Sequence, residues 1–437
     1  MMFGLADCNN FFVSCERVFH PSLRDKPVIV LSNNDGCAVA LSNEAKALGF
    51  KRGDPYFKIR SDAERHGVAV LSGSHRMYGD MSRRVMSTLA SIVPDGRIEV
   101  YSIDECFINI PDTIGDPLDF GRYAVRTVLR HTGIPISLGI APTRTLAKVA
   151  ARFAKKYPGY KGACIIDTEE KRLRALRLTD VSDVWGIGRR SAARLHCSGV
   201  NTALEFASLS VGQIRGLFSI TGERTWRELN GEPCIVHEEP DIVNKTITSS
   251  RSFITDIRDF ELLRQAVCSF AAIAGRKLRR IHGYARAVAV WVATNRFHEH
   301  EPQYSNSAEI MLPEAADDTP TLARHATEAL RVVFRPEFAY KRAGFTVTRI
   351  VSADGMQPSL FADVDDISRR HRLMSVVDSL NESSVAPDMI HLASEGPGLA
   401  PLTGHSHKAP DDSTAQPLRI YPELISDPDS LGKILRS

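Results

Sequence analysis

The sequence has few of the features that mark a specialised protein class. No apolar run approaches the roughly 20 residues that a membrane-spanning helix requires, and the first residues lack the basic and then apolar order of a signal peptide. The eight cysteines include no CxxC pair, so neither a zinc site nor a disulfide framework is indicated. The formal net charge is only +3, so composition alone does not indicate a nucleic-acid binder. We expect a protein of the cytoplasm with reduced thiols and no membrane partner.

The length and the residue pattern predict several α/β domains. A chain of 437 residues is too long for one hydrophobic core, so about two to four domains are expected. Up to residue 168, strand and helix patterns alternate, and SIDE (102–105) reads as the turn of a hairpin. This order favours a sheet with helices packed on one face. Short helices are predicted at about 172–230, and residues 254–350 read as helix, strand, helix, strand.

Three carboxylates occupy positions where strands end. Asp7 ends the apolar strand FGLAD, and Asp104 and Glu105 lie in the hairpin turn. If these strands are neighbours, the acids meet at one sheet edge, where like charges repel unless a cation lies among them. Oxygen ligands suit Mg²⁺, and two such ions about 4 Å apart can support phosphoryl transfer. On spacing alone, Asp7 could instead cap the next helix, with the other two acids solvated in the turn.

Several segments together resemble one enzyme family. DCNNFFVSCE (7–16) and YSIDECF (101–107) resemble the two metal-binding motifs of the Y-family (translesion) DNA polymerases. The resemblance continues, in order over about residues 1–350, through GCAVALSNEAKALGFKRGDPYF, YGDMSRRVMSTL, GIAPTRTLAKVAARFAKK, DVWGIGRR and LNGEPC. The chain is similar to the UmuC-type branch, which includes the catalytic subunit of bacterial DNA polymerase V. Asn9, where most members of the family have a second acid, is a feature of this branch.

The resemblance implies a multidomain α/β (α+β) fold in the form of a right-hand polymerase. The expected parts are a ferredoxin-like palm, small fingers, a helix-hairpin-helix thumb, an α/β little finger that binds DNA, and a partly disordered C-terminal tail. Their expected bounds are 1–13 and 76–168 for the palm, 14–75 for the fingers, 169–235 for the thumb, 236–245 for a linker, 246–350 for the little finger and 351–437 for the tail.

The resemblance also implies roles for the residues around the acids. The implied ligands of two catalytic Mg²⁺ ions are Asp7, Asp104, Glu105 and the backbone carbonyl of Cys8. Phe12 corresponds to the steric gate, an aromatic ring that clashes with a ribose 2′-OH. The residues expected to contact the dNTP are Asn10, Phe11, Phe12, Ser42, Asn43, Lys46 and Lys155. Without the resemblance, the phenylalanines are also consistent with core packing and the lysines with a solvated face.

Basic and glycine-bearing segments are expected to bind the DNA backbone. In VWGIGRR (184–190), the glycines let the chain approach a phosphate and the arginines add positive charge. GRKLRRIHGYAR (275–286) and TSSRSF (248–253) resemble the little finger, whose binding should depend on salt and ignore sequence. The predicted contacts are Gly186, Gly188, Arg189, Arg190, Arg251, Arg276, Lys277, Arg279 and Arg280. An ordinary αα-turn and a solvated basic helix face are the alternatives.

A short motif follows the expected little finger. Gln357, Leu360 and Phe361 match the QxxLF pattern of bacterial sliding-clamp ligands, in which a polar anchor precedes two apolar side chains. Patterns of this length also arise by chance, but the position after the little finger favours a clamp-binding segment. The resemblance further implies a UmuD′-like dimer and RecA as partners. The tail HSHKAPDDSTAQPLRIYPELI is only faintly similar to the basic ending of the family.

These observations predict an error-prone translesion DNA polymerase of the bacterial DNA-damage response, in the cytoplasm and associated with the nucleoid. The primer 3′-OH would attack the α-phosphate of a template-paired dNTP, and pyrophosphate would leave. No added domain with a second acid cluster is apparent, so we expect no proofreading. One alternative is a nucleotidyl cyclase, which the glycine-bearing turn, the basic segment and the clamp motif disfavour. Another is a DNA- and clamp-binding scaffold without catalysis, which the retained acids disfavour.

Overall fold

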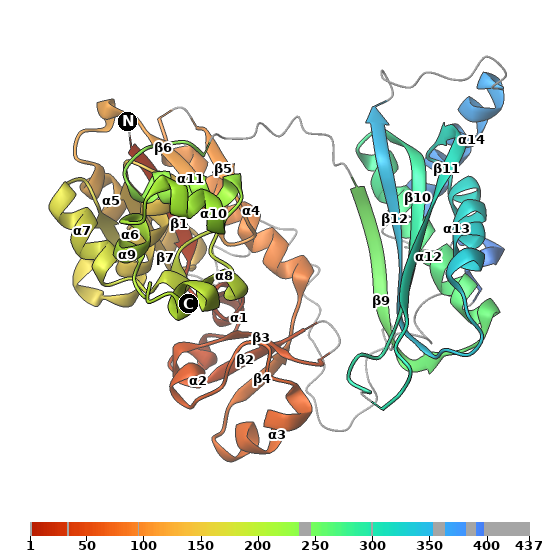
Figure 1. Cartoon of the computed structure of the whole chain (residues 1–437), viewed down its shortest axis with the longest axis horizontal. Helices are drawn as coiled ribbons and strands as arrows, with labels where there is room; N and C mark the ends of the chain where they lie inside the picture. The colour runs from red at the N-terminus through yellow and green to blue at the C-terminus, as the bar shows by residue number, and fades with distance from the viewer. Residues whose placement is uncertain are drawn as a thin grey trace. The chain divides into compact units, whose positions relative to one another are not determined.

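The computed structural model describes residues 2–32, 35–94, 96–235, 246–298, 300–352, 363–381 and 390–396. They form two compact units, with the boundary between residues 237 and 238. Among the described residues, the first unit contains two sheets and the second contains one (Figure 1). The hydrophobic cores of the two units are separate. The predicted mixed α/β fold class is confirmed.

The central sheet of the first unit places the first strand between two later ones. Its five strands follow the order β5-β6-β1-β7-β8. β1 pairs antiparallel with both β6 and β7, whereas β7 and β8 are parallel. The predicted hairpin is present, because β5 and β6 pair antiparallel on either side of residues 101–104. The strands are β1 Met2–Cys8, β5 Ile98–Val100, β6 Glu105–Ile110, β7 Ile136–Ala141 and β8 Ala163–Ile165.

Helices cover both faces of this sheet. Ala6 packs on one face with α4 and α5, and Leu5 packs on the opposite face with α6, because successive residues of a strand point to opposite sides. The expectation of helices on one face only is therefore wrong. α6 lies so close to β7 that a Cβ atom on Gly139 would be 2.0 Å from the Ala151 nitrogen. The helices are α4 His75–Ile92, α5 Pro117–Thr132 and α6 Arg144–Lys156.

The segment between β1 and α4 forms a smaller layer of its own. Its three strands follow the order β3-β2-β4, with β2 and β4 parallel. α1 begins directly after Asn10, which has a left-handed backbone conformation (φ 46°, ψ 48°). α1 then packs against β2, β3 and α4, and so joins this layer to the central sheet. The elements are α1 Phe11–Phe19, β2 Val28–Leu31, β3 Ala38–Leu41, α2 Asn43–Ala47, α3 Tyr56–Arg65 and β4 Ala69–Ser72.

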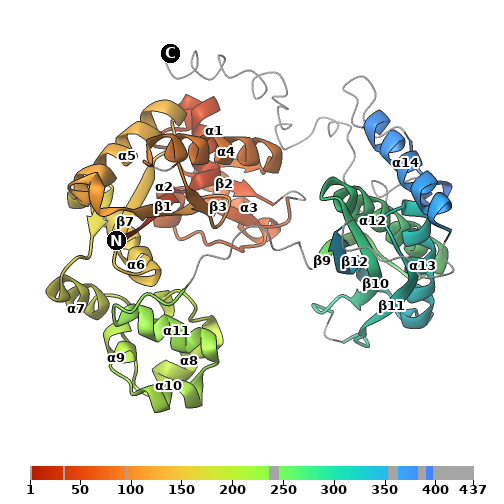
Figure 2. The same ribbon diagram turned by 90° about the horizontal axis from the view of Figure 1, so that it is seen from above.

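Short helices complete the first unit, as the sequence predicted for about 172–230. Figure 2 shows α8, α9, α10 and α11 gathered into one group. Their buried side chains share a core with α6, so this group packs on the face of the sheet that carries Leu5. The helices are α7 Glu169–Arg177, α8 Arg189–Cys197, α9 Ala203–Ala207, α10 Val211–Leu217 and α11 Ile220–Leu229.

The second unit is a four-stranded antiparallel sheet with two long helices packed on it (Figure 1). The chain order is β-α-β-β-α-β, and the strands lie in the order β11-β10-β12-β9. The sequence pattern missed β11, an edge strand that begins with three exposed polar residues and therefore lacks strict alternation. The elements are β9 Thr246–Ile257, α12 Phe260–Arg280, β10 Gly283–Thr294, β11 Ser305–Ala316, α13 Thr319–Val333 and β12 Tyr340–Ser352.

One further helix, α14 (Val364–Asn381), is attached to this unit by a buried arginine. Arg279 is 8% exposed, and its guanidinium donates to the Asp378 carboxylate at 2.7 and 2.9 Å and to the Asp317 carbonyl at 2.6 Å. Burial is tolerated because the charge is paired and hydrogen-bonded. The prediction that Arg279 contacts DNA is therefore wrong, since its donors are used inside the protein.

Candidate active site

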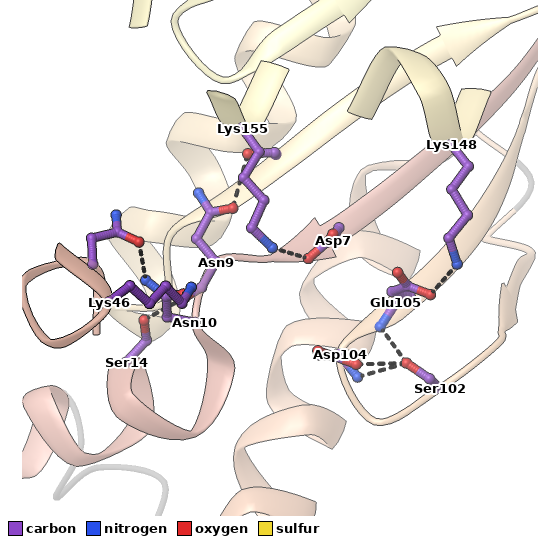
Figure 3. A network of polar contacts seen from close by, with 12 residues as sticks. Asp7, Asn9, Asn10, Ser14, Lys46, Ser102, Asp104, Glu105, Lys148 and Lys155 are labelled. Carbon is purple, nitrogen blue, oxygen red and sulfur yellow. Dashed lines mark hydrogen bonds and ion pairs between the residues drawn. The ribbon is translucent and has the colours of Figure 1, made fainter. Parts of the chain in front are cut away.

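The ends of β1 and β6 place two predicted metal ligands side by side on neighbouring strands, each with a lysine as its partner (Figure 3). Asp7 lies opposite Glu105 in the antiparallel register of the two strands. The backbone amide of Cys8 donates a hydrogen bond to the carbonyl oxygen of Asp104, 2.9 Å away. The fold therefore brings the three acids of the two motifs to one end of the central sheet.

Each of these two carboxylates is paired with a lysine of α6. Lys155 Nζ lies 2.8 Å from Asp7 Oδ1, and Lys148 Nζ lies 2.9 Å from Glu105 Oε2. Asp7 points to α6 because it alternates with Ala6, which packs on the other face. Residues seven apart lie about two turns apart on the same side of a helix. Sequence reasoning missed Lys148, which its seven-residue spacing from Lys155 could have revealed.

The turn before β6 is held by a serine. Ser102 Oγ donates to Asp104 Oδ1 at 2.7 Å and accepts hydrogen bonds from the backbone amides of Asp104 and Glu105 at 3.1 and 3.0 Å (Figure 3). One hydroxyl thus satisfies two amides and one carboxylate oxygen of the turn. This arrangement fixes the backbone that carries both acids.

Burial makes a charged Asp7 unfavourable. Desolvation raises the pKa of Asp7 above its usual value. The ion pair with Lys155 opposes this shift, whereas the negative charges of Glu105 and Asp104 add to it. The site therefore concentrates negative charge that a further cation would relieve.

The donor set fits a hard divalent cation. Its side-chain donors are carboxylate oxygens, which such ions prefer. The thiol of Cys8 is 2% exposed, and burial raises its pKa well above the usual range, so only the backbone oxygen of this residue suits a hard ion. Within the described residues, no three His, Cys, Asp or Glu side chains are placed as a closed metal-binding group. Two lysines and Ser102 hold the carboxylates instead.

A second polar cluster lies beside the acids. Lys46 Nζ donates to Asn10 Oδ1 at 2.6 Å, and Asn10 Nδ2 donates to Asn43 Oδ1 at 3.0 Å (Figure 3). The side-chain oxygen of Asn9 is engaged separately, because it accepts a hydrogen bond from Ser137 Oγ at 2.9 Å. The predicted nucleotide contacts Asn10, Asn43 and Lys46 thus meet, although they come from different elements.

This cluster is rich in positive charge. Desolvation lowers the pKa of Lys46, and the nearby charges of Lys155 and Arg52 lower it further. Three cations close enough to repel one another would be stabilised by a polyphosphate. Arg52 was missed from the sequence, because it lies beyond α2 in a turn and shares no helical spacing with Lys46.

Two of the predicted nucleotide contacts, Ser42 and Phe11, have side chains that are engaged inside the fold. Ser42 is fully buried, and its Oγ accepts hydrogen bonds from the amides of Ala45 and Val28 at 3.1 and 3.0 Å, so it caps α2. Phe11 is 4% exposed and belongs to the core between α1 and the central sheet. The core-packing alternative therefore holds for Phe11.

Phe12, by contrast, is only partly buried and stacks on another ring. Its centroid lies 4.2 Å from that of Tyr78, with an interplanar angle of 13°. Adjacent residues of a helix point about 100° apart. Phe12 therefore packs at the margin of the core that contains Phe11 and stays partly exposed.

The glycine-bearing turn before α8 adopts a tight conformation. Gly186 has φ +88°, and a Cβ atom there would lie 2.6 Å from Thr225 Oγ1, so a larger residue is excluded on two grounds. Gly188 is the N-cap of α8. Arg189 and Arg190 follow in the first turn of the helix, and both are exposed.

The remaining basic residues of the DNA prediction lie in the second unit. Arg251 of β9 and the α12 residues Lys277 and Arg280 are exposed, and Arg276 is half-buried. These side chains provide positive charge at the C-terminal end of α12 and on an edge strand. The predicted clamp motif, Gln357, Leu360 and Phe361, lies outside the described residues.

Comparison with known proteins places the chain in a family. Residues 6–152 match the impB/mucB/samB family, and residues 244–360 match the C-terminal domain of the same family. Protein UmuC of Salmonella typhimurium is 42% identical over 87% of this chain and 90% of its own length. DNA polymerase IV of Moorella thermoacetica is 28% identical over 92% of this chain and 98% of its own length. A solved Y-family DNA polymerase chimera of Dbh and Dpo4 shares the fold, with a TM-score of 0.64 at 20% identity over 80% of this chain and 100% of that chain.

The fold and these relatives define the class, which is that of the Y-family DNA polymerases. The chain belongs to the impB/mucB/samB family and is a UmuC-type translesion DNA polymerase. It is therefore a DNA-directed DNA polymerase, and the family implies a requirement for a divalent metal ion. The cyclase and the non-catalytic scaffold are not favoured. Among the described helices, none has the length and apolar character needed to span a membrane.

The raised pKa of Asp7 predicts a pH-dependent stability. Because the folded-state pKa lies above the unfolded value, ionising Asp7 lowers stability as the pH rises above about 4. In metal-free buffer, Asp7→Asn should therefore melt a few degrees above wild type at neutral pH, and the gap should narrow as the pH falls toward 4. Loss of the half-exposed Lys155 pair should offset little of this gain.

Thermal unfolding between pH 4.5 and 7.5 checks this expectation. Asp119→Asn is the matched control, because its carboxylate is 72% exposed in the same unit. If Asp7→Asn does not raise the melting temperature, or if its difference from wild type grows as the pH falls, desolvation of Asp7 is not the cause.

Proposed function

We propose that Asp7, Asp104 and Glu105, with the backbone carbonyl of Cys8, hold two Mg²⁺ ions for nucleotidyl transfer. The register that sets Asp7 opposite Glu105 is the observation that supports this assignment. When bound, the ions would supply neutralising charge and Lewis-acid activation of the reacting oxygens. The carboxylates of Asp7 and Glu105 point toward α6, and Ser102 would keep the turn rigid while the two lysines give up these carboxylates to the ions.

The same proposal assigns the cations beside the acids to the triphosphate of the dNTP. Lys46 and Lys155 bind its anionic oxygens as point charges, and Arg52 adds a third positive charge. Asn10 and Asn43 position Lys46 through their hydrogen bonds. Lys155 is paired with Asp7 in the nucleotide-free chain, so binding of a phosphate would exchange one anionic partner for another.

Phe12 is proposed as the steric gate. Its ring is partly buried and lies in the first turn of α1, five residues after Asp7 in the sequence. An apolar ring at this point excludes a ribose 2′-OH by contact and offers it no hydrogen bond. Selection of deoxynucleotides then depends on where this ring is held.

We further propose the hand-like division into parts that the sequence predicted. The palm comprises 1–13 and 76–168, the fingers 14–75, the thumb 169–235 and the little finger 246–350, with a linker at 236–245 and a tail at 351–437. The thumb would contact DNA phosphates through Gly186, Gly188, Arg189 and Arg190. The little finger would contribute Arg251, Arg276, Lys277 and Arg280. Such contacts bind phosphate without reading sequence.

The assignment of the acids predicts a large catalytic loss. Asp104→Ala should lower the rate of primer extension with Mg²⁺ and dNTPs by about a thousandfold or more, because several kcal/mol of charge stabilisation depend on the metal. Primer-template affinity should change little. Gel-based extension and fluorescence anisotropy measure the two quantities, with Asp119→Ala as the control. Extension by Asp104→Ala at the wild-type rate would refute the assignment.

The gate assignment predicts a change in sugar selectivity. Phe12→Ala should raise the efficiency of ribonucleotide insertion relative to deoxynucleotide insertion by about tenfold to a hundredfold, since one hydroxyl is no longer excluded. Deoxynucleotide insertion should persist. Single-turnover insertion of CTP and dCTP opposite template guanine measures the ratio. An unchanged ratio would remove Phe12 from this role.

Residues 355–366 are proposed to bind the sliding clamp of replication, and the tail to bind a UmuD′-like dimer and RecA at the bacterial nucleoid. Replacing Gln357, Leu360 and Phe361 with alanine should weaken clamp binding about tenfold or more, because the apolar plugs carry most of such a contact. Distributive synthesis should be spared. Surface-immobilised clamp measures the affinity, with Pro358→Ala and Ser359→Ala as controls. Equal affinities would exclude the motif.

A further inference from the structure

One side chain of α4 contacts two positions on α1 at once. Phe12 and Glu16 are four residues apart, which places them one turn apart on the same side of the helix. The ring of Tyr78 stacks on Phe12, with centroids 4.2 Å apart and planes inclined by 13°. The hydroxyl of Tyr78 donates to Glu16 Oε1 at 2.6 Å. Tyr78 therefore joins the proposed gate to a second, more deeply buried group.

Tyr78 and Glu16 are not among the residues proposed to bind metal or nucleotide. Tyr78 is fully buried and Glu16 is 5% exposed. Burial raises the pKa of Glu16, and the hydrogen bond from Tyr78 opposes this shift. Burial and the nearby Glu16 also raise the pKa of Tyr78, so its hydroxyl stays protonated and remains a donor. A carboxyl group buried in this way is tolerated because it is hydrogen-bonded.

The geometry points to Tyr78 as a positioning residue for sugar selection. We propose that Tyr78 holds the ring of Phe12 in the orientation that excludes a ribose 2′-OH, and that Glu16 fixes the orientation of Tyr78. This inference rests on the proposed role of Phe12 as the steric gate. Tyr78 acts through Phe12 and does not touch the nucleotide, because Tyr78 is fully buried.

The physical reason is that a gate must be stiff as well as bulky. The ring of Phe12 is only partly buried, and a ring free to change rotamer would admit the extra hydroxyl part of the time. A parallel stack removes that freedom on one face of the ring. The ring of His75 lies 5.8 Å from Phe12 and 6.2 Å from Tyr78, so the start of α4 encloses the stack further. The hydrogen bond to Glu16 then holds the ring of Tyr78 in place, so that it does not rotate together with the ring of Phe12.

The test compares sugar selectivity in four purified full-length variants. Tyr78→Leu removes both the ring and the hydroxyl, and should lower the preference for dCTP over CTP by about tenfold, with dCTP insertion within about threefold of wild type. Tyr78→Phe keeps the stack but loses the hydrogen bond, and should lower the preference by about threefold. Glu16→Gln keeps an acceptor and should stay near wild type. Tyr123→Leu, a change of a half-exposed tyrosine in α5, is the matched control.

A double substitution separates this role from a general loss of stability. A merely destabilised enzyme loses activity with both nucleotides, so the ratio of kcat/KM values does not move. If Tyr78 acts through Phe12, Phe12→Ala with Tyr78→Leu should show the same ratio as Phe12→Ala alone. A double variant with a clearly lower ratio would overturn the proposal.

The outcomes also separate this proposal from the gate assignment. If Phe12→Ala lowers the preference but Tyr78→Leu does not, the gate stands and the positioning role is rejected. If Phe12→Ala leaves the preference unchanged, both fail. Should Tyr78→Leu unfold at the assay temperature, Tyr78→Phe carries the test, and a wild-type ratio in that variant would reject the part assigned to Glu16.

Discussion

The pairing of β1 with β6 is the constraint on which the site depends. Its register sets Asp7 opposite Glu105 and brings the carbonyl of Asp104 to the amide of Cys8. Backbone hydrogen bonds fix these positions, so the negative charges cannot separate without breaking the sheet. Two lysines pair with Asp7 and Glu105, and a serine hydroxyl donates a hydrogen bond to Asp104. Structure and electrostatics are thus in conflict at this edge, which is typical of a functional site.

The two lysines of α6 neutralise this negative charge through ion pairs that can be broken again. A buried carboxylate needs a partner, but a lysine that reaches it from a separate helix can be exchanged for another cation. Lys155 is also close enough to Lys46 to lower its pKa, so it stands between an acidic and a basic cluster. A substrate that brings its own anionic groups would draw Lys155 toward the basic side. The same charges can therefore stabilise the free chain and prepare it for phosphate.

Local pattern predicted much of the secondary structure, because the core strands and helices of the first unit have strong periodicity. It failed for β11 and α14, whose amphipathic patterns are weak. α14 is held instead by ion pairs such as Arg279 with Asp378, which link residues far apart in the chain. No local signal distinguishes that arginine from its exposed neighbours Lys277 and Arg280. The same limit explains Ser42, which matches a binding position but serves as a helix cap.

The prediction that the three acids converge depended on the family resemblance, because their spacing alone also allowed a helix cap and a solvated turn. The sequence could not show which of Phe11 and Phe12 is fully buried and which stays partly exposed. Both are apolar and adjacent, and only the orientation of α1 decides which ring enters the core. That orientation follows from Asn10, whose left-handed backbone turns the chain from strand to helix, and from Tyr78, which lies where the second ring points. If Phe12 is the steric gate, as proposed, the turn after Asp7 contributes to sugar selection as well, because it fixes the direction in which this ring points.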